Sequence, residues 1–355
     1  MGEGASPNFA DGWYGMLSIL FFVFFGELIV QKSGIYYPVF YKNVVVDSED
    51  IYVLVREEHQ IKHYLTDGTF VSDIGRQGEG PGELNFPSAL FYDETGLYVL
   101  NNGRIEIYDR NGQFQVQVQR PQSASGPLAK VENGWLVSPN PFGTRSFLYS
   151  FDFSDKKELV PELKENAERS SIVQSYDPTL RTAFPLVDPS GKFAYCADPN
   201  GLRVDIYDLG KGQKIARFEK DRKHFSVNKS WADEKGSAFA EKIKKFDPKF
   251  QLNLQIPDEM PLIRWMLITP EGYLAVRLWG KNPYQDNGEL FVINEHGVEV
   301  DSICRDAECL QRVVWTHADS SIVLGYLDEE LVIGRVEKSR LSAWLKDYPM
   351  TLPDR

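Results

Sequence analysis

The residues that most often carry catalysis or hold metals are sparse in this chain. Its 355 residues include five histidines, at His59, His63, His224, His296 and His317. The sequence contains no nucleophile elbow, no HExxH pair, no phosphate loop and no EF-hand pattern. His59 and His296 fall at turns, and His63 falls within a strand-like run. We therefore expect these three histidines to be exposed or strand-surface residues, and we expect no metal and no cofactor.

Carboxylates and glycines also recur in patterns that could suggest ligand binding. Asp47, Asp93 and Asp188 occupy one repeated position, which would suit either a metal ligand or a residue that opens a turn. We favour turns, because Asp side chains accept backbone hydrogen bonds there. The glycines of residues 78–82 are followed by neither a Lys nor a helix start, so we interpret them as a linker and not as a phosphate site.

The three cysteines leave two alternatives open. Cys304 and Cys309 are close enough in sequence to close a small disulfide loop in an oxidising compartment, or both could stay as thiols. Their spacing does not match a metal site, since no CxxC pair or clustered His accompanies them.

The elements that must position any site are short strands. From residue 89 to residue 119, four alternating runs are separated by turns such as Asn-Gly, which tolerate positive φ. The same order appears once before, because Asp47 and Asp93 are 46 residues apart, as are Tyr52 and Tyr98. Repeats of this length without amphipathic helices are typical of propeller blades. The sequence therefore predicts stacked four-stranded sheets.

Residues 75–84 (GRQGEGPGEL), Phe86-Pro87 and the runs 96–99 (GLYV) and 104–109 (RIEIYD) resemble the NHL-type six-bladed β-propellers of bacteria. The likeness is sharp only up to about residue 120 and implies a fold, since such propellers serve as binding scaffolds, lyases or hydrolases. We accordingly predict an all-β, six-bladed β-propeller over residues 27–338. The last blade is one strand short, and we expect residues 28–31 to complete it.

One insertion interrupts the repeat. Asp188 and the matching Thr269 are 81 residues apart, and the excess at residues 220–258 shows helical spacing between blades 4 and 5. It could be a lid or partner-docking element, or a decorative insertion packed on the rim. Residues 339–355 form the tail, in which we predict a short helix.

The N-terminal 26 residues consist of a polar leader and an apolar run at residues 16–26. Eleven residues are too few to span a bilayer, which needs about 20, although the central regions of signal peptides are this short. A basic segment before the run is missing. We expect an export signal or membrane anchor that directs the protein to the periplasm or cell envelope. A buried first strand and a partner-docking segment remain alternatives.

Composition limits the partners. The net charge is −12 and the isoelectric point is about 5.0, so the chain lacks the basic surface that nucleic acids require. Aromatic residues make up 13% of the chain and suit half-buried sheet surfaces. We expect a protein, peptide or glycan ligand and no nucleic acid.

Candidate ligand-binding residues lie in the connections from second to third strands and from one blade to the next. The segment from Trp279 to Tyr284 is richest, because it sets aromatic rings beside cationic and amide groups. Trp279 could equally cover a neighbouring blade. The predicted rim residues are Arg56, His59, Asn102, Arg145, Arg277, Trp279 and Tyr284. We expect a non-enzymatic binding scaffold, with a lyase or hydrolase acting at the channel mouth as the alternative.

Overall fold

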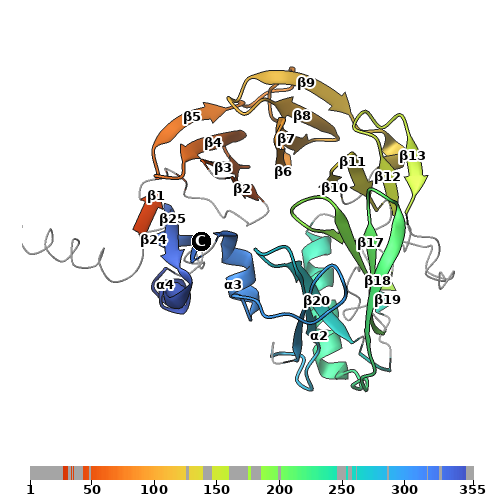
Figure 1. Cartoon of the computed structure of the whole chain (residues 1–355). Coiled ribbons are helices and arrows are strands. Elements are labelled where there is room, and N and C mark those ends of the chain that lie inside the picture. Colours follow the sequence, from red (N-terminus) through yellow and green to blue (C-terminus); the bar gives the residue numbers. More distant parts are fainter. Residues whose placement is uncertain are drawn as a thin grey trace, which may run out of the picture. The chain divides into compact units, whose positions relative to one another are not determined.

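A computed structural model of the chain describes residues 27–30, 33, 35, 43–47, 49–124, 128–138, 146–159, 175–176, 185–198, 201–245, 253–254, 258–260, 262–285, 288–317, 319–327 and 330–348. The chain divides into two compact units. Figure 1 labels most of their helices and strands. The first unit contains residues up to Val118 together with those from Ile303 onward, and the second runs from Gln119 to Ser302.

Three antiparallel sheets of four strands make up the first unit. One sheet runs in the order β2 (Val44–Val46), β3 (Asp50–Val55), β4 (Gln60–Leu65) and β5 (Phe70–Ile74). The next runs β6 (Pro87–Asp93), β7 (Gly96–Asn101), β8 (Arg104–Tyr108) and β9 (Phe114–Gln119). The third runs β1 (Glu27–Val30), β25 (Glu330–Glu337), β24 (Ser320–Leu327) and β23 (Val313–His317).

Three further antiparallel sheets lie in the second unit. They are formed by β10 (Leu128–Val131), β11 (Gly134–Val137), β12 (Phe147–Tyr149) and β13 (Lys156–Glu158); by β15 (Leu186–Val187), β16 (Phe193–Asp198), β17 (Leu202–Asp208) and β18 (Gln213–Lys220); and by β20 (Ile263–Ile268), β21 (Leu274–Leu278) and β22 (Leu290–Ile293). A short parallel pair joins β14 (Ser175–Tyr176) to β19 (Asn253–Leu254), a contact the sequence did not predict.

These six small antiparallel sheets confirm the predicted fold class, a six-bladed β-propeller. Each sheet is too thin to bury its own faces, so neighbouring sheets share a core. Val53 and Tyr64 of one blade pack with Leu324 and Ile333 of the last blade, while Leu54 and Ile61 pack with Leu90 and Val99 of the second blade. Burial between blades is therefore the main stabilising term.

The repeated aspartates open turns, as predicted. Asp47 accepts hydrogen bonds from the backbone N–H groups of Glu49 and Asp50, each at 2.8 Å. Asp188 does the same for Ser190, Lys192 and Phe193 at 2.7–2.9 Å. At Gly96, whose φ is 150°, an added Cβ would lie 2.0 Å from the carbonyl oxygen of Tyr108. The tight turn between β6 and β7 therefore requires a glycine at position 96.

The last blade is completed by the first strand of the chain. β1 pairs antiparallel with β25, with Glu27 opposite Arg335 and Leu28 opposite Gly334. The prediction placed this strand at residues 28–31, one residue further along. Pairing of the two ends of the chain covers a sheet edge that would otherwise be exposed.

A buried arginine fixes the C-terminal helix to this blade. Arg312 is the last residue of α3 (Ala307–Arg312) and donates to the carbonyl oxygens of Leu324, Leu345 and Tyr348. The last two oxygens close α4 (Leu341–Asp347), so Arg312 caps that helix. Burial lowers the pKa of Arg312, and its hydrogen bond to Glu308 opposes this shift.

The disulfide alternative is the one observed. Cys304 and Cys309 are joined across a sequence separation of five, and both are buried. Asp306, between them, caps α3 by accepting from the N–H of Cys309 at 2.8 Å. The disulfide and the cap together fix the first turn of the helix that carries Arg312.

Other expectations need correction or lie outside the described residues. The fourth strand predicted for blade 5 at residues 298–303 is reduced to one bridge between Glu299 and Ile293. The sequence reasoning also missed α3. Helices form where they were predicted in the insertion and the tail, as α2 (Lys229–Lys244) and α4. The apolar run at residues 16–26 lies outside the described residues.

Candidate functional site

Loops from the first two blades carry three predicted rim residues at the same end of their sheets. The turn from β3 to β4 carries Arg56 and His59, the linker into β6 carries Phe86, and the turn from β7 to β8 carries Asn102. We call residues 56–59, 85–87 and 101–102 the Phe86 loop cluster. Because strands in these sheets are antiparallel, the three loops emerge at the same end of their sheets.

Direct contacts hold the cluster together. The Nε of Arg56 donates to the carbonyl oxygen of Pro87 at 3.0 Å. The backbone N–H of Phe86 donates to the Nδ1 of His59 at 3.4 Å, and the two rings meet edge to face with centroids 5.9 Å apart. Since Nδ1 accepts, a neutral His59 carries its proton on Nε2.

A buried polar network fixes the linker that presents Phe86. The carboxylate of Glu106 is fully buried, pairs with Arg104 at 2.6 Å and accepts from the N–H of Gly82 at 3.2 Å. Arg104 in turn donates to the carbonyl oxygens of Glu79 and Glu83. Asn101 holds the end of the linker, because its side-chain oxygen accepts from the N–H of Asn85 at 2.6 Å. The predicted linker role of residues 78–82 is confirmed.

Three residues of the cluster adopt a backbone conformation that is rare for them. His59 and Phe86 both have φ of 56°, and Asn102 has φ of 45°. Asn tolerates this region, but a bulky Phe in it is an outlier that costs about 1–3 kcal/mol. Phe86 also leaves 72% of its surface exposed, so burial of its ring does not compensate for the strain. Phe86 therefore combines a strained backbone with an apolar ring that remains exposed to solvent.

The predicted rim residues of the second unit have a different environment. Trp279 is only 3% exposed, so the expectation of an exposed ring there is wrong. Its indole meets Trp231 of α2 edge to face at 5.4 Å, and Arg264 lies over it at 4.7 Å. The alternative that Trp279 serves packing is the one observed, although it packs on the insertion rather than on a neighbouring blade.

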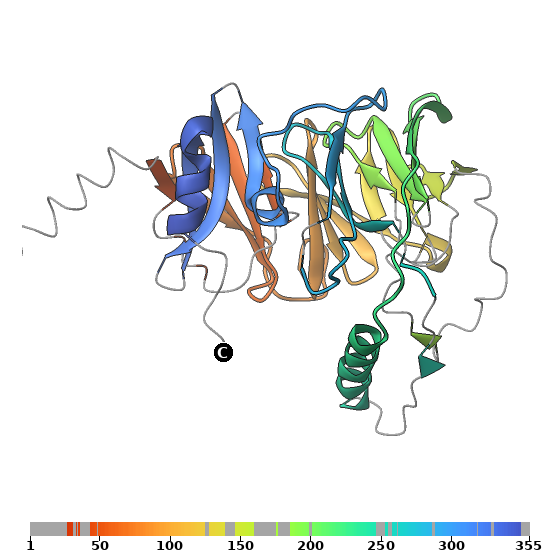
Figure 2. The ribbon, with the colours of Figure 1, turned by 90° about the horizontal axis from the view of Figure 1, so that it is seen from below.

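Backbone hydrogen bonds join the two ends of the insertion, and side chains of α2 pack against Trp279. The N–H of Met260 donates to the carbonyl oxygen of Phe225 at 2.7 Å, and the N–H of Val227 donates to that of Asp258 at 3.0 Å. Trp231, Ala232, Met260 and Trp279 form a separate apolar cluster. Figure 2 shows the rest of α2 extending beyond one end of the sheets of the second unit. This packing fits the decorative alternative for the base of the insertion.

Arg277, Tyr284 and Arg145 complete the predicted set. Arg277 lies in β21 opposite Trp265 and Leu290 and is half-buried. Tyr284 is exposed, and its hydroxyl donates to Glu234 of α2 at 2.9 Å, which raises the pKa of Tyr284. Arg145 lies outside the described residues. Tyr284 is therefore the predicted aromatic of this loop that faces solvent.

His63 departs from the prediction. It is only 6% exposed, its Nε2 lies 2.7 Å from Asp50, and its ring stacks on Tyr52 at 4.4 Å. The expectation of a strand-surface histidine is wrong because Tyr52 and Asp50 enclose the ring. The arrangement resembles an acid–base pair in composition, but burial closes it to a substrate. His296, by contrast, lies exposed in its hairpin turn.

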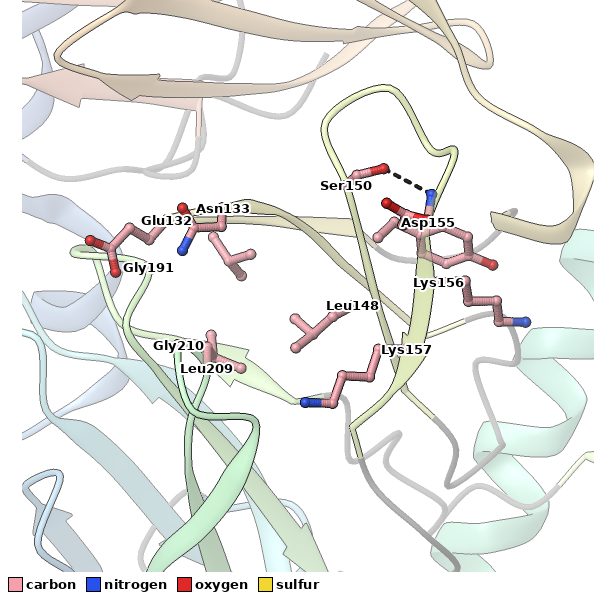
Figure 3. Close-up of a pocket in the computed structure, with 12 residues that line it drawn as sticks. Glu132, Asn133, Leu148, Ser150, Asp155, Lys156, Lys157, Gly191, Leu209 and Gly210 are labelled. Carbon is pink, nitrogen blue, oxygen red and sulfur yellow. Dashed lines mark hydrogen bonds between the residues drawn. The ribbon is translucent and has the colours of Figure 1, made fainter.

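A pocket that the sequence reasoning missed lies in the second unit. It measures about 340 Å³ and is formed by turns of the sheets β10–β13 and β15–β18 (Figure 3). Leu148, Leu209 and Val131 supply its apolar lining, while Asn133 and Lys157 supply polar groups. The pocket lies at the turns that follow the first and third strands of these sheets. The predicted rim lies at the opposite end of the sheets. Ordinary turn residues line the pocket, so no residue pattern distinguishes it in the sequence.

In the described part of the chain, no group of three or more His, Cys, Asp or Glu residues is arranged to hold a metal ion. No helix in that part of the chain has both the length and the apolar character needed to cross a bilayer.

Comparisons with known proteins add little beyond the fold. Neither a protein-family model nor a curated protein sequence matches this chain. A Bacteroides fragilis protein titled "Putative exported protein" has a similar structure, with a TM-score of 0.48, 13% identity, and coverage of 88% of this chain and 94% of that one. Hsv2 from Kluyveromyces lactis has a TM-score of 0.37 at 8% identity, covering 83% and 85%. Similarity at this level indicates neither a ligand nor an activity for this chain, and the NHL-type resemblance stays a prediction.

Proposed function

We propose that this protein is a non-enzymatic binding scaffold that captures a protein or peptide segment at the Phe86 loop cluster. The observation that carries the proposal is Phe86 itself, a strained and largely exposed ring held by a buried network. Rigid aromatic anchors beside cationic groups dominate binding at protein interfaces. Arg56, which donates to Pro87, and Asn102 in the neighbouring turn are exposed and could serve as polar partners for backbone groups of a ligand.

Export is part of the proposal and has its own support. The buried disulfide between Cys304 and Cys309 is typical of proteins that fold in oxidising compartments. We therefore propose that the protein is located in the periplasm or cell envelope. Attachment through residues 16–26 is part of the same proposal, and truncation before residue 27 followed by membrane fractionation tests it.

The binding proposal is tested with a phage-displayed random peptide library and, in parallel, a glycan array. Peptides selected on the wild-type protein should lose at least about tenfold in affinity for Phe86→Gly, because a central aromatic anchor contributes more than about 1.4 kcal/mol. Phe86→Gly keeps the loop conformation, since glycine accepts positive φ.

Phe70→Ala is the matched control. Phe70 lies in β5 and is 51% exposed, so its removal deletes a comparable phenyl group outside the cluster. Affinity should be unchanged in this variant. Equal affinity of Phe86→Gly and wild type for every selected peptide would exclude the cluster as the binding site, and binding confined to the glycan array would change the ligand class.

A further inference from the structure

The fourth strand of the second blade has an unusually uncharged edge. β9 reads Phe-Gln-Val-Gln-Val-Gln and ends the sheet order β6-β7-β8-β9, so in the described part of the chain no strand pairs with its outer side. Phe114 and Val116 are exposed, at 36% and 48%. A six-residue strand with unpaired N–H and C=O groups is a template for a further strand.

Corresponding strands in the other described sheets are protected by charge. β5 contains Asp73, β13 consists of two lysines and a glutamate, and β18 contains two lysines, an arginine and a glutamate. In the two remaining blades, the outer segment beside β22 contains Glu299, and the outer strand β1 contains Glu27. Charged edge residues are a common defence against edge-to-edge pairing. β9 lacks this defence, although the chain as a whole carries a net charge of −12.

The sequence of β9 suits a second copy of itself. Two-fold symmetry requires a strand to be complementary to itself. Successive side chains alternate between faces, so Gln115 and Gln117 share one face while Phe114, Val116 and Val118 share the other. In an antiparallel pair related by a two-fold axis perpendicular to the sheet, amides meet amides and apolar side chains meet apolar ones. No charge is buried and no like charges meet.

We propose that two copies of this chain pair through β9, antiparallel and edge to edge, to form a weak homodimer. Six residues per strand make a contact smaller than a standard protein interface, so the expected dissociation constant is about 10–100 µM. The surface lies along a strand and not at the Phe86 loop cluster, so the proposal is independent of the proposed ligand.

Salt should strengthen this dimer. Each copy carries −12, and the two copies repel each other at long range. At physiological ionic strength, salt screens the repulsion between charges more than about 8 Å apart, while a neutral strand pair has no attractive ion pair to lose. An interface built on ion pairs would weaken instead. The direction of the salt dependence therefore separates the two kinds of contact.

Sedimentation velocity over about a hundredfold range of protein concentration tests the proposal. The wild-type chain should shift from monomer to dimer, and sodium chloride should raise the dimer fraction. Val116→Lys should raise the dissociation constant of the dimer by at least about tenfold, because it places two like charges at the strand pair. Ile215→Lys on β18, which is similarly exposed, is the control and should dimerise as the wild type does.

Cysteine cross-linking tests the geometry. In a two-fold antiparallel pair, the residue at the axis faces its own copy, so Val116→Cys or Gln117→Cys should form an intermolecular disulfide under mild oxidation, whereas Ile215→Cys should not. A wild-type chain that stays monomeric throughout would overturn the proposal. So would an equal loss of dimer in Val116→Lys and Ile215→Lys, or a monomer that instead binds a synthetic extended peptide at β9.

Discussion

Phe86 and Trp279 occupy comparable places in their blades but have opposite environments. Both lie in connections at the ends of sheets, but Trp279 was a predicted recognition residue, whereas Phe86 was not among the predicted rim residues. Phe86 is 72% exposed on a strained backbone, whereas Trp279 is 3% exposed beneath α2. The difference shows that an aromatic residue in such a connection is available for binding only where no inserted element covers it.

The largest expected effect is a loss of stability at Trp279, the buried residue of this pair. Trp279→Ala should destabilise the second unit by about 3–5 kcal/mol, because it leaves a cavity against Trp231 and Met260. Urea denaturation followed by circular dichroism measures the loss. Tyr284→Phe removes only the exposed hydrogen bond to Glu234 and should cost less than about 1 kcal/mol. A loss in Trp279→Ala as small as that of the control would mean that the insertion does not depend on this packing.

A smaller loss of stability is expected at Asp47, which lies at the end of the first blade opposite to the Phe86 loop cluster. Asp47 accepts from Tyr92 and pairs with Arg110. Burial acts to raise the pKa of Asp47, but the hydrogen bonds from Tyr92 and two backbone N–H groups, together with Arg110, outweigh it and lower the pKa. Asp47→Asn should therefore cost about 2 kcal/mol at neutral pH.

The pH dependence follows from the sign of that shift. A lowered pKa contributes stability above the unfolded value of about 3.9, and this stability is lost as the pH falls through the folded value. The difference between wild type and Asp47→Asn in urea midpoints should be full at pH 7 and shrink below about pH 4. A constant difference down to the lowest pH would contradict the assigned role of the carboxylate.

The smallest expected effect concerns the backbone strain at Phe86, the exposed residue of the pair. Phe86→Gly should raise stability by about 1 kcal/mol, because glycine adopts φ of 56° without a Cβ clash. Asn102→Gly should gain only a few tenths, roughly 0.3 kcal/mol, since Asn already tolerates this region. Melting temperatures by calorimetry measure both. Phe86→Ala retains the Cβ and should show no gain, so equal stabilisation by Ala and Gly would refute strain as the cause.

Much of the fold could be predicted because its determinants are local. The 46-residue offset, the period-two alternation and the Asp- and Gly-bearing turns place most strands within a few residues, including the closing strand β1. The fourth strand predicted for blade 5 did not form as a full strand, because residues 298–303 alternate in polarity but make only one bridge to β22, between Glu299 and Ile293. α3 was missed because it is only six residues long and depends on the disulfide and on the Asp306 cap.

The site was only partly predictable. Arg56, His59 and Asn102 were named from their place in the connections, but Phe86 was noted only as part of a family motif. Nothing in the residue types showed that its ring would remain outside, or that Trp279 would be buried. The pocket of the second unit could not be foreseen either, since its lining comes from turns of two sheets.

The amino-acid sequence by itself determined the repeat, the turns, the number of blades and the uncharged character of β9. Tertiary structure alone decided which aromatic ring faces solvent, which histidine is enclosed, and that Arg312 closes the C-terminal helix. The physical reason is that strand and turn preferences act over a few neighbouring residues, whereas burial depends on side chains that the chain brings in from far away, such as Trp231 over Trp279.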